Sequence, residues 1–241
     1  MKVAVCIPAR YHSTRFPGKP LATIAGETMI RRVYRGARSA RRADFVAVLS
    51  DDNRIVDHIR AIGGDAYRVD GDFRSGTDRI AAFVKDKPFD LVVNVQGDEP
   101  LIDGGVVDEL IDCIVRSNAP MATLARPCEP ELKDDPDVVK LVVDREGYAI
   151  YFSRLPIPFN RNPFEDYLMH IGVYAYRKKT LIDLAGMPES VLEKAEGLEQ
   201  LRALENGIKI KVCMCNKKLI GVDTPEDIQK VERHLKGNSH V

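Results

Sequence analysis

The chain has 241 residues, of which 44% are hydrophobic and 30% are charged, a composition typical of a globular protein with a substantial core. Its 36 lysines and arginines balance 36 aspartates and glutamates, so the formal net charge at pH 7 is zero. Nucleic-acid-binding proteins usually carry an excess of positive charge. We therefore expect no nucleic-acid partner, and any recognition of anions must be local.

The chain carries no segment that predicts contact with a membrane. No apolar run approaches the roughly 20 residues that a spanning helix needs, and a strand-like run begins at Val3 without a preceding signal peptide. The five cysteines are odd in number and form no CxxC pair, which favours reduced structural thiols and argues against a zinc site. We expect a cytoplasmic protein with no membrane partner.

The first half of the chain alternates between short β-branched runs and segments with helical spacing. Strands are predicted at Val3–Ile7, Phe45–Leu49, Ala66–Val69 and Leu91–Val95, and helices at Thr28–Ser39, Asn53–Ile62 and Thr77–Lys85. Such alternation predicts an open, mostly parallel sheet with helices on both faces. The fold class is therefore α/β.

The pattern changes between residues 121 and 176, where prolines are frequent and the helical rhythm disappears. Strands are predicted at Val138–Val143, Tyr148–Phe152 and Ile171–Tyr176, which indicates an antiparallel extension or, alternatively, irregular loops on one domain. Further along, helices are predicted at Lys178–Ala185 and Gly197–Asn206, a C-cap at Gly207, a strand at Ile208–Met214, and a last helix with Thr224 as N-cap and Pro225 in its first turn.

The loop between the first strand and the first long helix, IPARYHSTRFPGKP from Ile7 to Pro20, combines cationic and small residues. The cationic or potentially cationic residues are Arg10, His12, Arg15 and Lys19, and the small ones are Ala9, Ser13 and Gly18. Ligands bind beyond the carboxyl ends of strands in open parallel sheets, and a polyphosphate needs cations together with free backbone N–H groups. The segment lacks the GxxxxGK[ST] pattern of a P-loop. It is a different phosphate-binding loop or an ordinary solvated basic loop.

Carboxylates follow the apolar strand that ends in NVQGDEP, at Asp98 and Glu99. Carboxylates at the end of a buried strand are costly without a partner, and Mg²⁺ commonly takes one or two of them together with phosphate oxygens. Asp223, in GVDTPED, follows another strand region and is a candidate for the second carboxylate. Capping of the following helix is the alternative for Asp98 and Glu99, and it is the simpler explanation for Asp223 taken alone.

A fourth segment, FRSGTDRI from Phe73 to Ile80, places a tight turn with exposed hydrogen-bond donors before a helix. Such a turn can read the edge of a nucleotide base, or it can be an ordinary helix N-terminus.

Taken together and in order, these segments resemble the 3-deoxy-D-manno-octulosonate (Kdo) cytidylyltransferases. The resemblance rests on IPARYHSTRFPGKPL at Ile7–Leu21, SGTDRI at Ser75–Ile80, NVQGDEP at Asn94–Pro100, MATL at Met121–Leu124, YFSRLPIPF at Tyr151–Phe159, HIGVYAYR at His170–Arg177, LEQLRALENG at Leu198–Gly207 and VDTPEDI at Val222–Ile228. The segments span nearly the whole chain.

The resemblance implies a fold, a reaction and partners. The fold is a nucleotide-diphospho-sugar transferase-like domain over residues 1–241, with residues 121–176 as an antiparallel extension that forms a homodimer. The reaction is Mg²⁺-dependent transfer of CMP from CTP to the anomeric hydroxyl of Kdo, which releases pyrophosphate and supplies lipopolysaccharide synthesis. CTP and Kdo are the implied small-molecule partners.

The resemblance also implies roles for individual residues. The implied nucleotide-binding residues are Pro8, Ala9, Arg10, Ser13, Arg15, Lys19, Arg74, Ser75 and Asp98. Arg15, Lys19, Asp98 and Asp223 are the implied catalytic residues, the two aspartates as metal ligands. The implied sugar-binding residues are Gln96, Arg154, His170, Tyr174, Glu199 and Gln200.

Two other functions remain compatible with the sequence. One is a cytidylyltransferase for a related sugar acid, 8-amino-Kdo or an N-acylneuraminate. The other is a nucleotide-binding regulator without turnover, which would need the phosphate loop but not both aspartates.

Overall fold

The computed structural model describes residues 1–12 and 16–237, and the chain divides into two compact units. The first unit comprises residues 1–108 and the C-terminal segment from Lys218, and the second comprises residues 109–217. Helix α4 (Gly104–Ser117) contains the boundary between them. No helix in the described ranges is long and apolar enough to cross a membrane.

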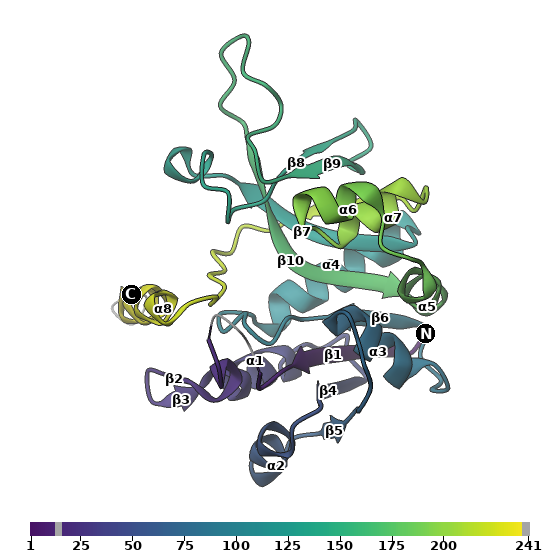
Figure 1. Cartoon of the computed structure of the whole chain (residues 1–241), viewed down its shortest axis with the longest axis vertical. Coiled ribbons are helices and arrows are strands. Elements are labelled where there is room, and N and C mark those ends of the chain that lie inside the picture. Colours follow the sequence, from purple (N-terminus) through teal and green to yellow (C-terminus); the bar gives the residue numbers. More distant parts are fainter. Residues whose placement is uncertain (13–15, 238–241) are drawn as a thin grey trace. The chain divides into compact units, whose positions relative to one another are not determined.

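The sheet of the first unit is entirely parallel (Figure 1). Its strand order is β6 (Leu91–Asn94), β1 (Val3–Ala9), β4 (Phe45–Ser50) and β5 (Ala66–Arg68). All residues of β1 and β6 are buried, which explains why their sequences are nearly continuous apolar runs. The four strands predicted in the first half of the chain are confirmed to within two residues.

Three helices connect these parallel strands: α1 (Met29–Arg38), α2 (Asn53–Ala61) and α3 (Gly76–Val84). Right-handed crossovers put α1 and α2 on one face of this sheet and α3, which leads back towards β6, on the other. Side-chain caps begin two of them, because Asp52 accepts a hydrogen bond from the backbone of Arg54 and Ser75 accepts one from Asp78. The predicted helices are confirmed with bounds shifted by one residue.

Smaller elements complete the first unit. A 3-10 turn, η1 (Lys19–Leu21), leads into a hairpin of β2 (Thr23–Ile24) and β3 (Glu27–Thr28). The last helix, α8 (Pro225–Gly237), contacts this hairpin through Glu232, whose carboxylate accepts a hydrogen bond from the backbone N–H of Ala25 at 2.8 Å.

The second unit contains a mixed sheet. Strand β7 (Met121–Pro127) pairs in parallel with β11 (Ile210–Met214) and antiparallel with β10 (Leu168–Arg177). Strand β8 (Lys140–Val143) pairs antiparallel with both β10 and β9 (Ala149–Ser153). The antiparallel pairing predicted between residues 121 and 176 is therefore present.

The helices of the second unit include two short ones that the sequence did not predict, η2 (Pro130–Leu132) and α6 (Val191–Glu196). The structure also contains α5 (Lys178–Gly186) and α7 (Gln200–Glu205). The helix predicted from Gly197 to Asn206 is present as α7 but begins three residues later, because Gly197 takes a left-handed conformation with φ 64° and ends α6. Gly207 does follow the end of α7 with φ 73°, as predicted.

A buried ion pair connects the last two of these helices. The Arg202 guanidinium in α7 donates from Nε to Glu193 Oε2 at 2.8 Å and from Nη2 to Glu193 Oε1, and the two residues are 2% and 8% exposed. Removal of either partner would leave an uncompensated charge in the core.

The cysteines depart from the expectation of five reduced thiols. Cys113 in α4 and Cys213 in β11 form a disulfide with a Cα–Cα distance of 6.4 Å, whereas Cys6, Cys128 and Cys215 are buried free thiols. The two bonded residues are 100 positions apart, so their spacing in the sequence contains no sign of the pairing. The tertiary packing of α4 on β11 brings them within disulfide reach.

Candidate active site

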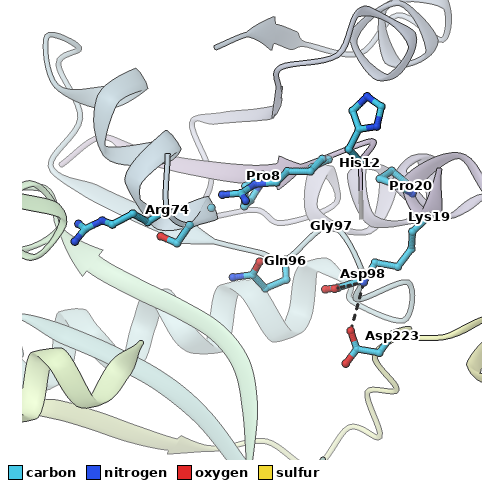
Figure 2. A pocket seen from close by; sticks show the side chains of 13 residues that line it. Pro8, His12, Lys19, Pro20, Arg74, Gln96, Gly97, Asp98 and Asp223 are labelled. Carbon is cyan, nitrogen blue, oxygen red and sulfur yellow. Dashed lines mark hydrogen bonds and ion pairs between the residues drawn. The ribbon is translucent and has the colours of Figure 1, made fainter. Parts of the chain in front are cut away.

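A cavity of about 550 Å³ lies in the first unit, beyond the carboxyl ends of β1 and β6 (Figure 2). It is lined by Pro8, Ala9, Arg10, His12, Lys19, Pro20, Arg74, Ser75, Gly76, Gln96, Gly97, Asp98 and Asp223. Nine of these were candidates from the sequence; His12, Pro20, Gly76 and Gly97 were not among the assigned site residues. Ser13 and Arg15, also assigned to this loop, lie outside the described residues.

The loop after β1 is held by its own backbone and by α2. Gly18, with φ 75°, donates its N–H to Tyr11 O at 2.9 Å, and a Cβ at Gly18 would come within 3.3 Å of the Tyr11 hydroxyl. The Arg54 guanidinium lies 3.3 Å from the centroid of the Tyr11 ring and also binds the Asp52 carboxylate through two hydrogen bonds, at 2.9 and 2.6 Å. This pairing with Arg54 lowers the pKa of Asp52 to about 2. These contacts fix the position of Tyr11 and Gly18 in the loop next to the cavity.

Lys19 joins the two candidate metal-binding aspartates. Its Nζ lies 2.7 Å from Asp98 Oδ2 and 3.5 Å from Asp223 Oδ1, and it donates to Val222 O at 2.8 Å. Figure 2 shows the two carboxylates converging on this ammonium group. Residues from three distant segments therefore meet at one point, where a cation between carboxylates is electrostatically favoured.

Backbone contacts fix the position of each aspartate. The N–H of Val222 donates to Asp98 O at 2.9 Å, which attaches the segment before α8 to the segment after β6. The Asp227 carboxylate in α8 accepts hydrogen bonds from the backbone N–H groups of Asp223 and Thr224, at 3.0 and 2.9 Å. The acidic first turn of α8 thus orients the chain at Asp223.

Glu99 adds a third carboxyl group beneath this cluster. Burial, together with the nearby charges of Asp98 and Asp223, raises the pKa of Glu99 to about 8. Its Oε2 is buried and has no hydrogen-bond partner among the residues that the structure describes. The raised pKa keeps the Glu99 carboxyl mostly protonated at neutral pH and reflects the negative charge of the two aspartates, which attracts a cation to this corner of the site.

Two glycines that line the cavity, Gly76 and Gly97, allow the backbone at each position to pack closely against Pro8 of β1. A Cβ at Gly76 would lie 2.7 Å from Pro8 Cγ, and one at Gly97 would lie 2.8 Å from Pro8 O, so neither position accepts a side chain without rearrangement. Both glycines occur in motifs that the sequence singled out, SGTDRI and NVQGDEP, although neither was assigned a role. Arg74, at the start of α3, donates to the Asp78 carboxylate at 2.9 Å.

Five of the six candidate sugar-binding residues lie in the second unit, and Gln96 lies in the cavity of the first. Arg154 follows β9, and its guanidinium donates from Nε to Glu196 O at 2.8 Å and from Nη1 to Pro136 O at 2.9 Å. The Glu196 carboxylate accepts from the Arg154 backbone N–H and from the Ser153 hydroxyl, both at 2.9 Å. Within the described ranges, Nη2 of Arg154 donates to no protein acceptor, so this end of the guanidinium can bind a ligand.

The remaining four candidates lie on β10 and around the start of α7. The ring centroids of His170 and Tyr174 are 5.3 Å apart, and Phe152 contacts the other side of the His170 ring at 5.1 Å. Although His170 is only half-buried as a residue, burial of its ring lowers the pKa of His170 to about 3 and keeps the ring neutral. Burial also raises the pKa of Tyr174, with a smaller contribution from Glu199. Gln200 is buried, with no partner for its Nε2 in the part of the chain described.

Comparisons with known proteins identify the family of the chain. A family model described as cytidylyltransferase matches residues 4–210. The 3-deoxy-manno-octulosonate cytidylyltransferase of Syntrophotalea carbinolica is 47% identical over 98% of this chain and 100% of its own length, and that of Thermodesulfovibrio yellowstonii is 45% identical over 97% and 98%.

Solved structures extend the likeness to three dimensions. A CMP:2-keto-3-deoxy-manno-octonic acid synthetase complexed with CTP superposes with a TM-score of 0.93 at 39% identity, over 99% of this chain and 100% of that one. A cytidylyltransferase from Leptospira borgpetersenii, with a TM-score of 0.65 and 17% identity over 98% of this chain and 87% of that one, shares the fold. The chain therefore belongs to the cytidylyltransferases and, within them, to the 3-deoxy-manno-octulosonate cytidylyltransferase family.

Proposed function

We propose that this protein transfers CMP from CTP to the anomeric hydroxyl of Kdo and releases pyrophosphate. The observation that carries the proposal is the cluster of Lys19, Asp98 and Asp223 in a cavity at the carboxyl ends of parallel strands. Little covalent chemistry falls to the protein in such a displacement at phosphorus, so positioning and charge stabilisation dominate. A cavity lined by both cationic side chains and carboxylates suits both tasks.

The donor set at this cluster fits Mg²⁺. Asp98 and Asp223 offer hard oxygen ligands around one point, where Lys19 already places a positive charge. No group of three metal-ligating side chains occurs among the described residues, which agrees with an ion whose other ligands are phosphate oxygens and water. When bound, Mg²⁺ would neutralise charge on the phosphates and polarise the attacking hydroxyl.

The side chains of the cavity have separable tasks in this proposal. Lys19 and Arg10 bind the triphosphate, and Lys19 offsets the charge that develops on the leaving pyrophosphate. Arg74 and Ser75 bind the cytidine portion near the start of α3, together with Pro8 and Ala9, which also line the cavity. Ser13 and Arg15, outside the described residues, are proposed to bind phosphate with them.

The sugar acid is proposed to bind Arg154 through its carboxylate. The guanidinium is already oriented by Glu196 O and Pro136 O, and its Nη2 remains available, so little side-chain freedom is lost on binding. The sugar hydroxyls are proposed to bind Gln96, Glu199 and Gln200. Two residues of β10, His170 and Tyr174, are proposed to bind them as well.

A homodimer is proposed on the basis of exposed apolar side chains in the second unit. Ile150, Leu155 and Phe159 are 58%, 71% and 87% exposed, and all three lie within residues 121–176. Large apolar side chains exposed in one segment are typical of an interface. We also propose that the enzyme acts in the cytoplasm, where CTP is available.

One experiment tests the reaction and discriminates the substrates. Purified protein with CTP and Mg²⁺ is offered Kdo, 8-amino-Kdo or N-acetylneuraminate, and pyrophosphate release is measured. We expect the highest kcat/KM with Kdo. A higher kcat/KM with another sugar acid would identify that acid as the substrate in place of Kdo. Absence of pyrophosphate release with all three sugar acids would favour a nucleotide-binding regulator without turnover.

Two variants test the metal site in the same assay. Asp98→Asn and Asp223→Asn are each expected to lower turnover by at least ~10²-fold with an unchanged circular dichroism spectrum, because each removes a ligand charge. Asp70→Asn is the matched control, because Asp70 is an exposed carboxylate that pairs with Arg68 and does not line the cavity. Near-normal activity of either site variant would contradict the shared-metal proposal.

A further inference from the structure

Strand β10 contains an irregularity between its two candidate sugar-binding side chains. His170 pairs with Ala125 and Ile171 with Leu124, but the next residue of β7, Thr123, pairs with Tyr174. Gly172 and Val173 are thus taken up by a bulge. The bulge makes His170 and Tyr174, four apart in the chain, neighbours on one face with ring centroids 5.3 Å apart.

The Thr123 side chain closes this bulge. Thr123 is fully buried, and its Oγ1 lies 2.9 Å from Val173 O, 3.3 Å from Ile171 O and 2.9 Å from Nε2 of His170. The hydroxyl has one proton to donate and three neighbours at hydrogen-bond distance.

The direction of each hydrogen bond follows from this count. The two carbonyl oxygens are acceptors only, so the Thr123 proton points to the nearer one, Val173 O. His170 Nε2 must then carry a proton and donate it to Thr123 Oγ1. In the reverse arrangement Thr123 would donate its proton to His170. Thr123 Oγ1 and Val173 O would then face each other at 2.9 Å without a proton between them.

The imidazole is neutral as well as oriented. Phe152 and Tyr174 enclose it, and this burial lowers the pKa of His170 to about 3. A neutral ring with its proton on Nε2 has a bare lone pair on Nδ1. Among the described residues, Nδ1 of His170 has no protein donor, and part of the residue remains accessible.

We propose that Thr123 is a positioning residue for the sugar-acid site: it holds His170 as the Nε2–H tautomer, so that Nδ1 accepts a hydrogen bond from a hydroxyl of the sugar acid. This proposal rests on the proposed function in placing His170 at the sugar. It divides the recognition of the substrate by chemistry, because Arg154 offers donors to the carboxylate while His170 offers an acceptor to a hydroxyl.

The tautomer is measured directly by two-dimensional ¹H–¹⁵N spectroscopy of the imidazole rings at neutral pH. The resonances of His170 are assigned by their loss in His170→Gln. We expect a protonated Nε2 and an unprotonated Nδ1 in the wild type and in Thr123→Ser, which keeps the hydroxyl, and loss of this single tautomer in Thr123→Val. A protonated Nδ1 in the wild type overturns the proposal whether or not the Thr123 variants fold.

Kinetics supply the second measurement. Thr123→Val is expected to raise KM for Kdo roughly three- to tenfold and to leave KM for CTP unchanged, whereas Thr123→Ser stays close to the wild type. Thr28→Val is the matched control, because Thr28 Oγ1 makes the same kind of bond to His58 Nε2, at 2.7 Å, and lines no part of the cavity. An unchanged KM for Kdo in a folded Thr123→Val variant overturns the positioning role.

The two measurements separate this inference from the proposed function. A protein that shows the Nε2–H tautomer but does not use Kdo contradicts the proposed substrate and leaves the tautomer assignment intact. A protein that turns over Kdo with a protonated Nδ1 contradicts the inference alone.

Discussion

The neutral His170 should make the folded protein sensitive to acid. Its pKa is about 3 in the folded state, because of burial, against an ordinary value of 6.5 in the unfolded chain. The unfolded state therefore binds a proton first as pH falls, and stability is lost between the two pKa values. The titratable side chain in ring contact with His170 is Tyr174, and because its pKa is raised by burial and by Glu199, Tyr174 stays neutral in this window.

The size of the effect follows from the shift. At 1.36 kcal/mol per pKa unit, the full difference is a ceiling of ~5 kcal/mol, of which about 2–3 kcal/mol is lost between about pH 7 and pH 4.5. Most of the other groups titrate alike in wild type and His170→Gln, so the difference between their pH profiles isolates His170. We expect the wild type to lose more stability over this range than the variant.

Urea denaturation followed by circular dichroism, repeated at several pH values, measures both profiles. A control at pH 7 establishes the baseline cost of the substitution itself, which does not enter the comparison of slopes. Parallel profiles for wild type and His170→Gln would refute the reasoning, because they would mean that His170 titrates normally in the folded protein.

Three further predictions concern other parts of the molecule. Arg154→Lys keeps the charge but loses the guanidinium geometry, so KM for Kdo should rise roughly ten- to a hundredfold with KM for CTP unchanged; an effect on CTP alone would move Arg154 to the nucleotide site. Sedimentation should show a homodimer at micromolar concentration and a monomer for Phe159→Asp, because Phe159 is 87% exposed in the proposed interface; a monomeric wild type would contradict the dimer. Arg202→Met should lower the free energy of unfolding by about 3–5 kcal/mol in urea, and adding Glu193→Leu should restore most of it. A single variant as stable as the wild type would mean that the Arg202–Glu193 pair is not buried in solution.

Much of the first unit was determined by local sequence. The runs that became β1, β4 and β6 are apolar except for Ser50 and Asn94 at the ends of β4 and β6, and the helices between them repeat their apolar residues at helical spacing. A continuous apolar run indicates a strand that is buried on both faces, and apolar residues at helical spacing indicate a helix that is buried on one face. Both patterns can be recognised from a few consecutive residues. The cavity residues at the ends of these strands were accessible to the same reasoning, since strand ends in a parallel sheet share one edge.

Other features depended on contacts that no local pattern encodes. Lys19 lies between Asp98 and Asp223, which are 79 and 204 positions away. The bulge of β10 depends on the Thr123 hydroxyl of another strand, and the disulfide joins cysteines 100 residues apart. The role of Gly197 was also ambiguous in the sequence, because a glycine at this position is compatible with the end of one helix or the start of the next. In the structure it ends α6, and α7 begins at Gln200.

The division has a physical origin. Secondary structure and burial follow from the backbone preferences and hydrophobic periodicity of a few consecutive residues, so the sequence of this protein determined its strands, its helices and the edge where its ligands bind. The direction of a hydrogen bond, the neutrality of an imidazole and the pairing of two thiols are set by which groups meet after folding, and by how little water remains between them. Only the tertiary structure could decide that His170 is neutral and that Lys19 is held between Asp98 and Asp223.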